Sequence, residues 1–97
     1  MPDTGNLRKQ EKDLKAQRDA AKSRAAQVLQ RQRALKASYD LNWAARTAIW
    51  KTSAAGANFK ANYKEQFDGM TEEHKKQTDE VKRLEGKISD VQSQMKK

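Results

Sequence analysis

The feature that most constrains this chain is a hydrophobic repeat in its C-terminal half. Downstream of Gly56, uncharged and mostly apolar residues recur at alternating spacings of four and three. A repeat of 3.5 residues is typical of a helix that packs along a second helix. The positions of this C-terminal seam are Tyr63, Phe67, Met70, His74, Gln77, Val81, Leu84, Ile88, Val91 and Met95. The sequence therefore predicts a long coiled-coil helix that needs a partner helix.

The N-terminal half carries a weaker seam with the same spacing. Strong helix formers fill this half as well, and the only proline is Pro2, so we expect helix nearly throughout. Alanine, glutamine and arginine occupy many of its positions. These positions are Leu7, Leu14, Arg18, Ala21, Ala25, Val28, Gln32, Leu35, Tyr39, Asn42, Arg46 and Ile49. Two seams in one chain indicate that its halves pair with each other.

The densest group of turn-forming residues lies at 52–58 and marks the expected corner. We predict an all-α fold, a long two-helix antiparallel coiled-coil hairpin with its bend at 53–56. The predicted organisation is a disordered N-terminal tail over 1–6, a basic helix over 7–52 and a heptad helix over 57–97.

A corner at 53–56 fixes which residues face each other across the hairpin. The numbers of facing residues then add to about 109, so that Val28 meets Val81 and Gln32 meets Gln77. In this register each glutamine amide has a hydrogen-bonding partner, and His74 forms a polar layer that sets the register. The seam residues expected to hold the hairpin together are Leu14, Val28, Leu35, Val81, Leu84, Ile88, Val91 and Met95.

The composition limits how much apolar surface this hairpin can bury. The chain has 97 residues, of which 35% are hydrophobic and 35% are charged. That proportion is poorer in core-forming residues than an ordinary globular domain. We therefore expect partner helices or self-association to complete the core.

Residues suited to catalysis or metal binding are scarce. The chain has no cysteine and a single histidine, His74. Disulfides, thiolate metal sites, histidine clusters and nucleophile–base pairs that include histidine are therefore excluded. We expect no enzymatic activity, no cofactor and no bound metal.

The sequence also bears on where the protein resides. No apolar run approaches the roughly 18 to 20 residues that span a bilayer, and the N-terminal stretch MPDTGNLRKQ lacks the apolar core of a signal peptide. We expect a soluble protein without transmembrane insertion, located in the cytoplasm or within an assembled particle. Leaderless secretion stays open as an alternative.

Positive charge is concentrated in the first half of the chain. Of the net charge of +8, residues 1–52 contribute +7, and residues 15–36 contain seven basic residues and one acidic residue. Such a run attracts an acidic surface or nucleic acid. The run lacks interleaved aromatic residues and any nucleic-acid-binding motif, so a solvated outer face is the alternative. The candidate basic face consists of Arg24, Arg31, Arg33 and Lys36.

All six aromatic residues fall between positions 39 and 67, around the predicted corner. Trp43, Trp50 and Phe59 are the candidate partner-binding residues at this tip, because tryptophan is enriched at binding hot spots. The alternative is a local cluster that closes the bend. We expect Trp43 to be packed beside the seam and Trp50 to be exposed.

The overall plan resembles that of the WXG100 proteins. The resemblance rests on a length near 100 residues, two long antiparallel helices and a tryptophan-containing bend near the middle. Trp50 is followed by Lys51 and Thr52 in place of the family's Trp-x-Gly, and Gly56 comes six residues later. The resemblance implies a helical hairpin exported by a type VII secretion system, or a partner protein of that pathway.

The leading interpretation is a non-enzymatic helical interaction protein that serves as a structural or adaptor component of a larger assembly, such as a virion or another supramolecular particle. Its partners would be helices of other proteins or further copies of itself. A WXG100-like hairpin is the second hypothesis. A basic helical module that binds nucleic acid is the third, and steep salt dependence of binding would distinguish it.

Overall fold

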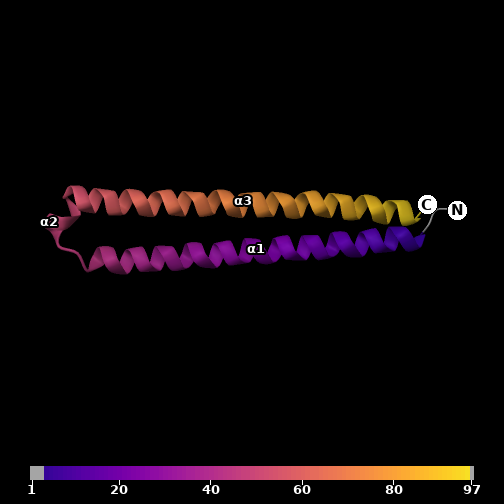
Figure 1. Cartoon of the computed structure of the whole chain (residues 1–97), viewed down its shortest axis with the longest axis horizontal. Helices are drawn as coiled ribbons and strands as arrows, with labels where there is room; N and C mark the ends of the chain where they lie inside the picture. The colour runs from indigo at the N-terminus through magenta and orange to yellow at the C-terminus, as the bar shows by residue number, and fades with distance from the viewer. Residues whose placement is uncertain (1–3, 97) are drawn as a thin grey trace.

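A computed structural model describes residues 4–96 and shows a two-helix hairpin. Helix α1 runs over Thr4–Ala44, the short helix α2 over Ala48–Lys51 and helix α3 over Ala54–Lys96. Helices α1 and α3 lie antiparallel, α2 closes one end, and the start of α1 and the end of α3 lie at the other (Figure 1). The Cα trace measures 75 × 16 × 13 Å. The predicted all-α helical hairpin is confirmed.

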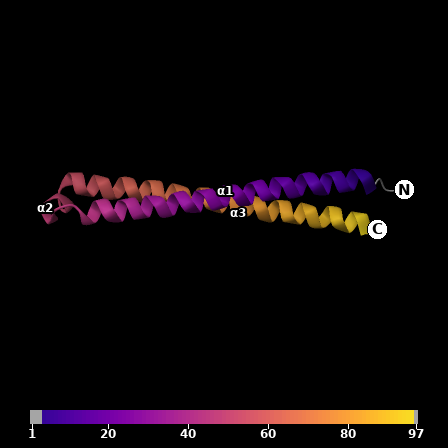
Figure 2. The same ribbon diagram turned by 90° about the horizontal axis from the view of Figure 1, so that it is seen from below.

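The two long helices wind across each other along the rod. Figure 2 shows α1 and α3 crossing near the middle, with the ends displaced to opposite sides. A seam that repeats every 3.5 residues drifts around a straight helix of 3.6 residues per turn. Helices that keep such a seam in contact must therefore coil around one another.

The buried core is small and lies in the half of the rod that contains the chain ends. It consists of Ala21, Ala25 and Val28 from α1 and Leu84, Ile88 and Val91 from α3. Each position of the C-terminal seam, from Tyr63 to Met95, is buried or half-buried. Small side chains on α1 allow close approach of the larger aliphatic side chains on α3.

The N-terminal seam does not extend as far as predicted. Asn42, Arg46 and Ile49 are exposed, and Trp43 is half-buried next to Asn42. For Arg46 and Ile49 the reason is that α1 ends at Ala44, so the periodicity of a continuous helix no longer applies beyond that point.

The predicted element boundaries differ from the structure at both ends of α1. A helix continuing to residue 52 is wrong, because α1 stops eight residues earlier and a separate helix, α2, begins at Ala48. Of the predicted bend at 53–56, only Ser53 lies outside the helices, since α3 already begins at Ala54. Residues 4–6, expected in the disordered tail, are helical. The remainder of that predicted tail, residues 1–3, lies outside the described part.

The register also differs from the prediction, by about one heptad. The partners' numbers add to 102 for the stacked rings of Tyr39 and Tyr63, and to 101 for Arg24 and Gln77, whose side chains form a hydrogen bond. Gln32 does not meet Gln77; its Nε2 donates to Thr71 Oγ1 at 2.6 Å. A heptad seam fits almost equally well after a slip of seven residues. The register is therefore decided by the corner, which comes earlier in the chain than the predicted bend at 53–56.

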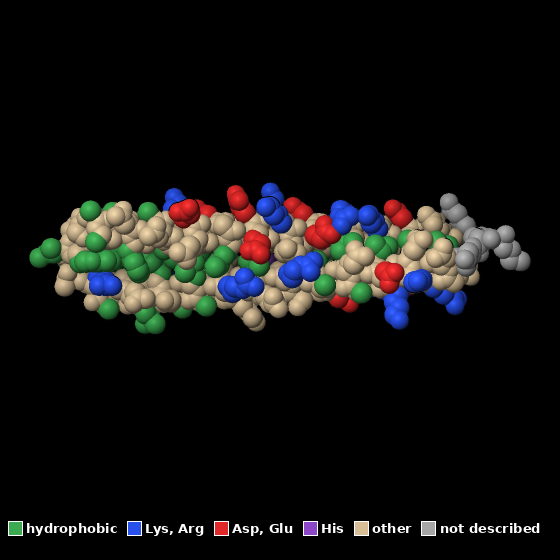
Figure 3. All heavy atoms as spheres, viewed as in Figure 1, with side chains coloured by type: hydrophobic (Ala, Val, Ile, Leu, Met, Phe, Trp, Pro, Cys, Tyr) green, Lys and Arg blue, Asp and Glu red, His purple; other side chains and the backbone are tan. Residues whose placement is uncertain are grey.

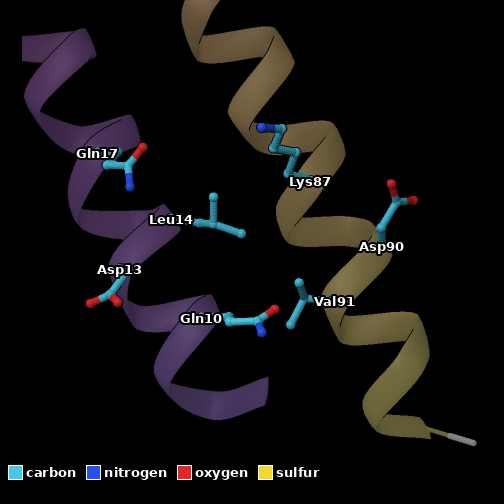
Figure 4. A pocket seen from close by; sticks show the side chains of 7 residues that line it. All are labelled: Gln10, Asp13, Leu14, Gln17, Lys87, Asp90 and Val91. Atoms are coloured by element: carbon cyan, nitrogen blue, oxygen red, sulfur yellow. The ribbon is translucent and has the colours of Figure 1, made fainter. Parts of the chain in front are cut away.

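The seam borders an open groove near the chain ends. Leu14 and Val91 point toward one another there across an open groove of about 390 Å³ (Figure 4). Asp13 and Asp90 point away from the groove, toward solvent. The hairpin therefore leaves apolar surface incompletely covered at this end.

The register can be tested by crosslinking one position on α1 to alternative positions on α3. With Gln32→Cys, a cysteine at Thr71 should be bridged within one chain by a short bismaleimide. A cysteine at Gln77 should not, because it lies about 9 Å further along the helix. Mass spectrometry of the monomer band measures both yields. Efficient bridging of the second pair alone would restore the register that sums to 109.

Candidate partner-binding tip

Two hydroxyl side chains build the corner. Thr47 has an extended backbone, and its Oγ1 accepts a hydrogen bond from the Trp50 backbone N–H at 3.2 Å, which caps the N-terminus of α2. Ser53 does the same for α3, where its Oγ accepts from the Gly56 backbone N–H at 3.3 Å. Caps of this kind satisfy amide groups that have no partner within the helix. They begin two new helices within seven residues and make the turn compact.

Gly56 is the residue on which the close packing of this corner depends. It is buried, and a Cβ atom at this position would lie 2.4 Å from the Trp50 carbonyl oxygen and 2.6 Å from the Lys51 carbonyl oxygen. Real Cβ contacts are not that short, so only glycine lets the backbone of α2 lie directly against α3. The glycine supports a close approach of two backbones within the first turn of α3.

The six aromatic rings form one continuous cluster on the inner side of the tip. Phe59 contacts three rings, with centroid distances of 5.4 Å to Tyr39, 6.4 Å to Trp43 and 5.6 Å to Trp50. Tyr39 stacks on Tyr63 at 4.0 Å, and the Tyr63 ring contacts Phe67 at 5.6 Å. Offset stacking and edge contacts of this kind stabilise aromatic pairs beyond area burial. The cluster joins α1, α2 and α3.

The expected contrast between the two tryptophans is not observed. Both Trp43 and Trp50 are half-buried, and their rings meet edge to face at 6.1 Å. Trp50 lies in a capped helix that packs on α3, so its proximity to the corner does not expose it. Trp43, Trp50 and Phe59 are therefore brought together at the tip, as parts of one cluster.

The most exposed large apolar side chains of the tip are not aromatic, and sequence periodicity does not predict their exposure. Leu41 is 75% exposed and Ile49 is 84% exposed. Figure 3 shows hydrophobic side chains gathered at the end of the rod that holds α2. Ile49 had been placed in the seam, and the signal that separates it from the seam is Thr47, a helix-capping residue just upstream.

The tip is positively charged without any compensating acid. Residues 41–64 contain four basic residues and no acidic residue. The Arg46 guanidinium carbon lies 4.4 Å from the centroid of the Trp50 ring, and Lys51 Nζ lies 5.8 Å from the Trp43 ring centroid. These cation–π contacts hold two of the cations beside the aromatic cluster.

The structure divides the candidate basic face into two pairs of residues. Arg24 Nε donates to Gln77 Oε1 at 3.1 Å, and Lys36 Nζ pairs with Asp40 Oδ2 at 3.1 Å. Arg31 and Arg33 are exposed, and within residues 4–96 neither takes part in a side-chain hydrogen bond or ion pair. The second pair is the part of the face open to an external anion.

One outward-facing stripe of α1, opposite the seam, is unusual in carrying no charge. Its positions between residues 16 and 44 repeat at spacings of four and three, and all of them are exposed. Outer positions of a coiled coil are normally the most charged ones. We call this surface the uncharged face, and it consists of Ala16, Ala20, Ser23, Gln27, Gln30, Ala34, Ala37, Leu41 and Ala44.

Titratable side chains do not converge on a reactive centre in the part of the chain that the structure describes. No group of three or more histidine, aspartate or glutamate side chains that could hold a metal ion occurs among residues 4–96. A hydrogen bond from Arg83 lowers the pKa of Glu80, but both lie on the exposed surface of α3. Over the same residues, no helix is long and apolar enough to cross a membrane.

Comparisons with known protein families, curated proteins and solved structures find no match to this chain. The proposed function therefore rests on the geometry of the tip and of α1.

The role of Gly56 leads to a test with two internal controls. Gly56→Ala should lower the free energy of unfolding by about 1 kcal/mol or more, because the new methyl group meets two backbone carbonyls. Gly69→Ala and Gly86→Ala should each raise it by about 0.5 to 1 kcal/mol, because nothing lies within 4 Å and alanine favours helix. Urea unfolding followed by circular dichroism measures all three; stabilisation by Gly56→Ala would contradict the close approach.

The aromatic cluster and the exposed aliphatic residues should respond differently to truncation. Phe59→Ala removes contacts with three rings and should lower the free energy of unfolding by about 2 kcal/mol, less than for a fully buried phenylalanine. Ile49→Ala should change it by no more than about 0.5 kcal/mol. Equal losses in urea unfolding would show that Ile49 is packed.

Proposed function

We propose that this chain is a non-enzymatic helical interaction protein that acts as a structural or adaptor component of a larger assembly. The observation that carries the proposal is the uncharged face of α1. It extends along most of a helix whose opposite side already packs on α3, so α1 has two surfaces suited to helix packing. A hairpin with this property holds a third helix in register with its own two.

The small residues of the uncharged face suit a helix as the partner. Ala16, Ala20, Ala34 and Ala37 allow a second helix to approach closely. The open groove between Leu14 and Val91 adds apolar surface near the chain ends. Together these surfaces supply burial that the slender hairpin lacks.

The charges beside the uncharged face define the chemistry of the partner. Helical periodicity places Arg24 and Arg31 along one border of this face, and along the other it places Arg33 between Asp19 and Asp40, which lie nearer the ends of the face. The central part of the face is therefore bordered by cations. A partner helix with a small or apolar stripe bordered by Asp and Glu is complementary to it, whereas a second copy of α1 would place arginines opposite arginines.

A second candidate function is that of a WXG100-like hairpin, favoured by the corner. Trp50 packs at the turn, and Gly56 permits the contact between α2 and α3. Export of the chain by cells that contain a type VII apparatus, and its loss when the secretion ATPase is deleted, would support this candidate.

The leading proposal is tested by locating the partner and then measuring its affinity. A photo-crosslinking amino acid at Ala34 should capture one segment in the native host, and a synthetic peptide of that segment should be acidic and helical when bound. Arg24→Gln, Arg31→Gln and Arg33→Gln combined should weaken its binding roughly tenfold or more. Isothermal titration calorimetry measures the affinities.

The matched control removes the same charge from α3. Lys75, Lys76 and Lys82 are exposed, and their combined replacement by Gln should leave the affinity within about twofold of the parent. Equal weakening by the two triple variants would show that the loss of affinity depends on net charge alone. A captured segment that is neither acidic nor helical would overturn the assignment of the partner.

A further inference from the structure

The tip combines exposed aliphatic residues with cations, and of these residues only Leu41 also belongs to the uncharged face. Ile49 and Leu41 are 84% and 75% exposed. Arg46 and Lys51 lie over the indole rings beside them, and residues 41–64 contain no acid. Aliphatic, tryptophan and basic side chains at one end of a protein are typical of segments that enter the interface of an anionic bilayer.

Nucleic acid is a poorer match for this surface. Single-stranded binding uses the faces of exposed aromatic rings as stacking platforms. At this tip the rings of Tyr39, Trp43 and Phe59 stack on one another, so their faces are already occupied. The large apolar side chains that remain exposed, Leu41 and Ile49, have no role in contacts with nucleic acid phosphates.

Protein partners at the tip are also less complementary. A second copy of the tip would bring two groups of four uncompensated cations together. The Cα trace is only 16 × 13 Å in cross-section, so end-on docking offers less than the roughly 800 Å² per partner of a standard protein interface. A fluid headgroup layer closes around a narrow tip and needs no preformed pocket.

We propose that the tip docks end-on to an anionic phospholipid surface, with Ile49 and Leu41 entering the interface and Arg46, Lys51 and Lys60 contacting lipid phosphates. The contact is peripheral, since the tip supplies only a few apolar side chains. The half-buried indoles of Trp43 and Trp50 then lie at headgroup depth, where tryptophan is favoured. The rest of the rod projects into water.

The experiment uses the full chain and vesicles of phosphatidylcholine with or without phosphatidylglycerol. Flotation should recover the protein with the vesicles that contain phosphatidylglycerol, and brominated lipids in those vesicles should quench tryptophan emission. Ile49→Ser with Leu41→Ser should weaken binding roughly tenfold or more. Leu29→Ser, a half-buried leucine elsewhere on α1, is the matched control and should bind like the parent.

Charge variants separate tip docking from adsorption along the basic arm. Arg46→Gln, Lys51→Gln and Lys60→Gln combined should remove both flotation and quenching. The triple variant of Arg24, Arg31 and Arg33 should keep the quenching. Flotation without quenching, or binding that is insensitive to the loss of Ile49 and Leu41, would show adsorption by the arm and overturn the proposal. Absence of binding to phosphatidylglycerol vesicles, or equal binding to neutral ones, would overturn it as well.

Discussion

Contact between α1 and α3 along one heptad seam is the constraint on which the rest of the structure depends. The seam keeps two long helices together although the buried core within residues 4–96 consists of six hydrophobic residues, two of them alanines. Because the core is narrow, most positions on both helices face water and are free to vary in charge. The uncharged face of α1 stands out for that reason, since burial within the hairpin does not account for it.

The corner determines the register of the two helices, which the seam alone leaves open. A repeating seam holds two helices equally well in several registers, so the connection must select one of them. Here Thr47 and Ser53 begin two successive helices, and Gly56 lets the backbones of α2 and α3 touch. The selected register brings Tyr39 onto Tyr63, and the aromatic cluster then fixes the corner in turn.

Sequence periodicity predicted which face of each helix is inward better than which residues meet. The inward positions from Val28 to Tyr39 follow from the 3.5-residue repeat alone, because a heptad slip leaves them unchanged. The partners of Gln32 depend on the corner, where the capping role of Thr47 is a local backbone effect that hydrophobic periodicity does not report. The exposure of Ile49 follows from the same cap. The side chains that are exposed at the tip could therefore be identified only from the three-dimensional structure.

The shape of the rod has a consequence for the geometry of any assembly that contains it. The start of α1 and the end of α3 both lie at the end opposite α2, at the far end of a 75 Å long Cα trace (Figure 1). A ligand at α2 and a domain joined to either terminus are therefore held apart by a distance that the helices fix. The length of the hairpin sets this spacing. Inserting or deleting one heptad in α1 together with one in α3 would change it by about 10 Å.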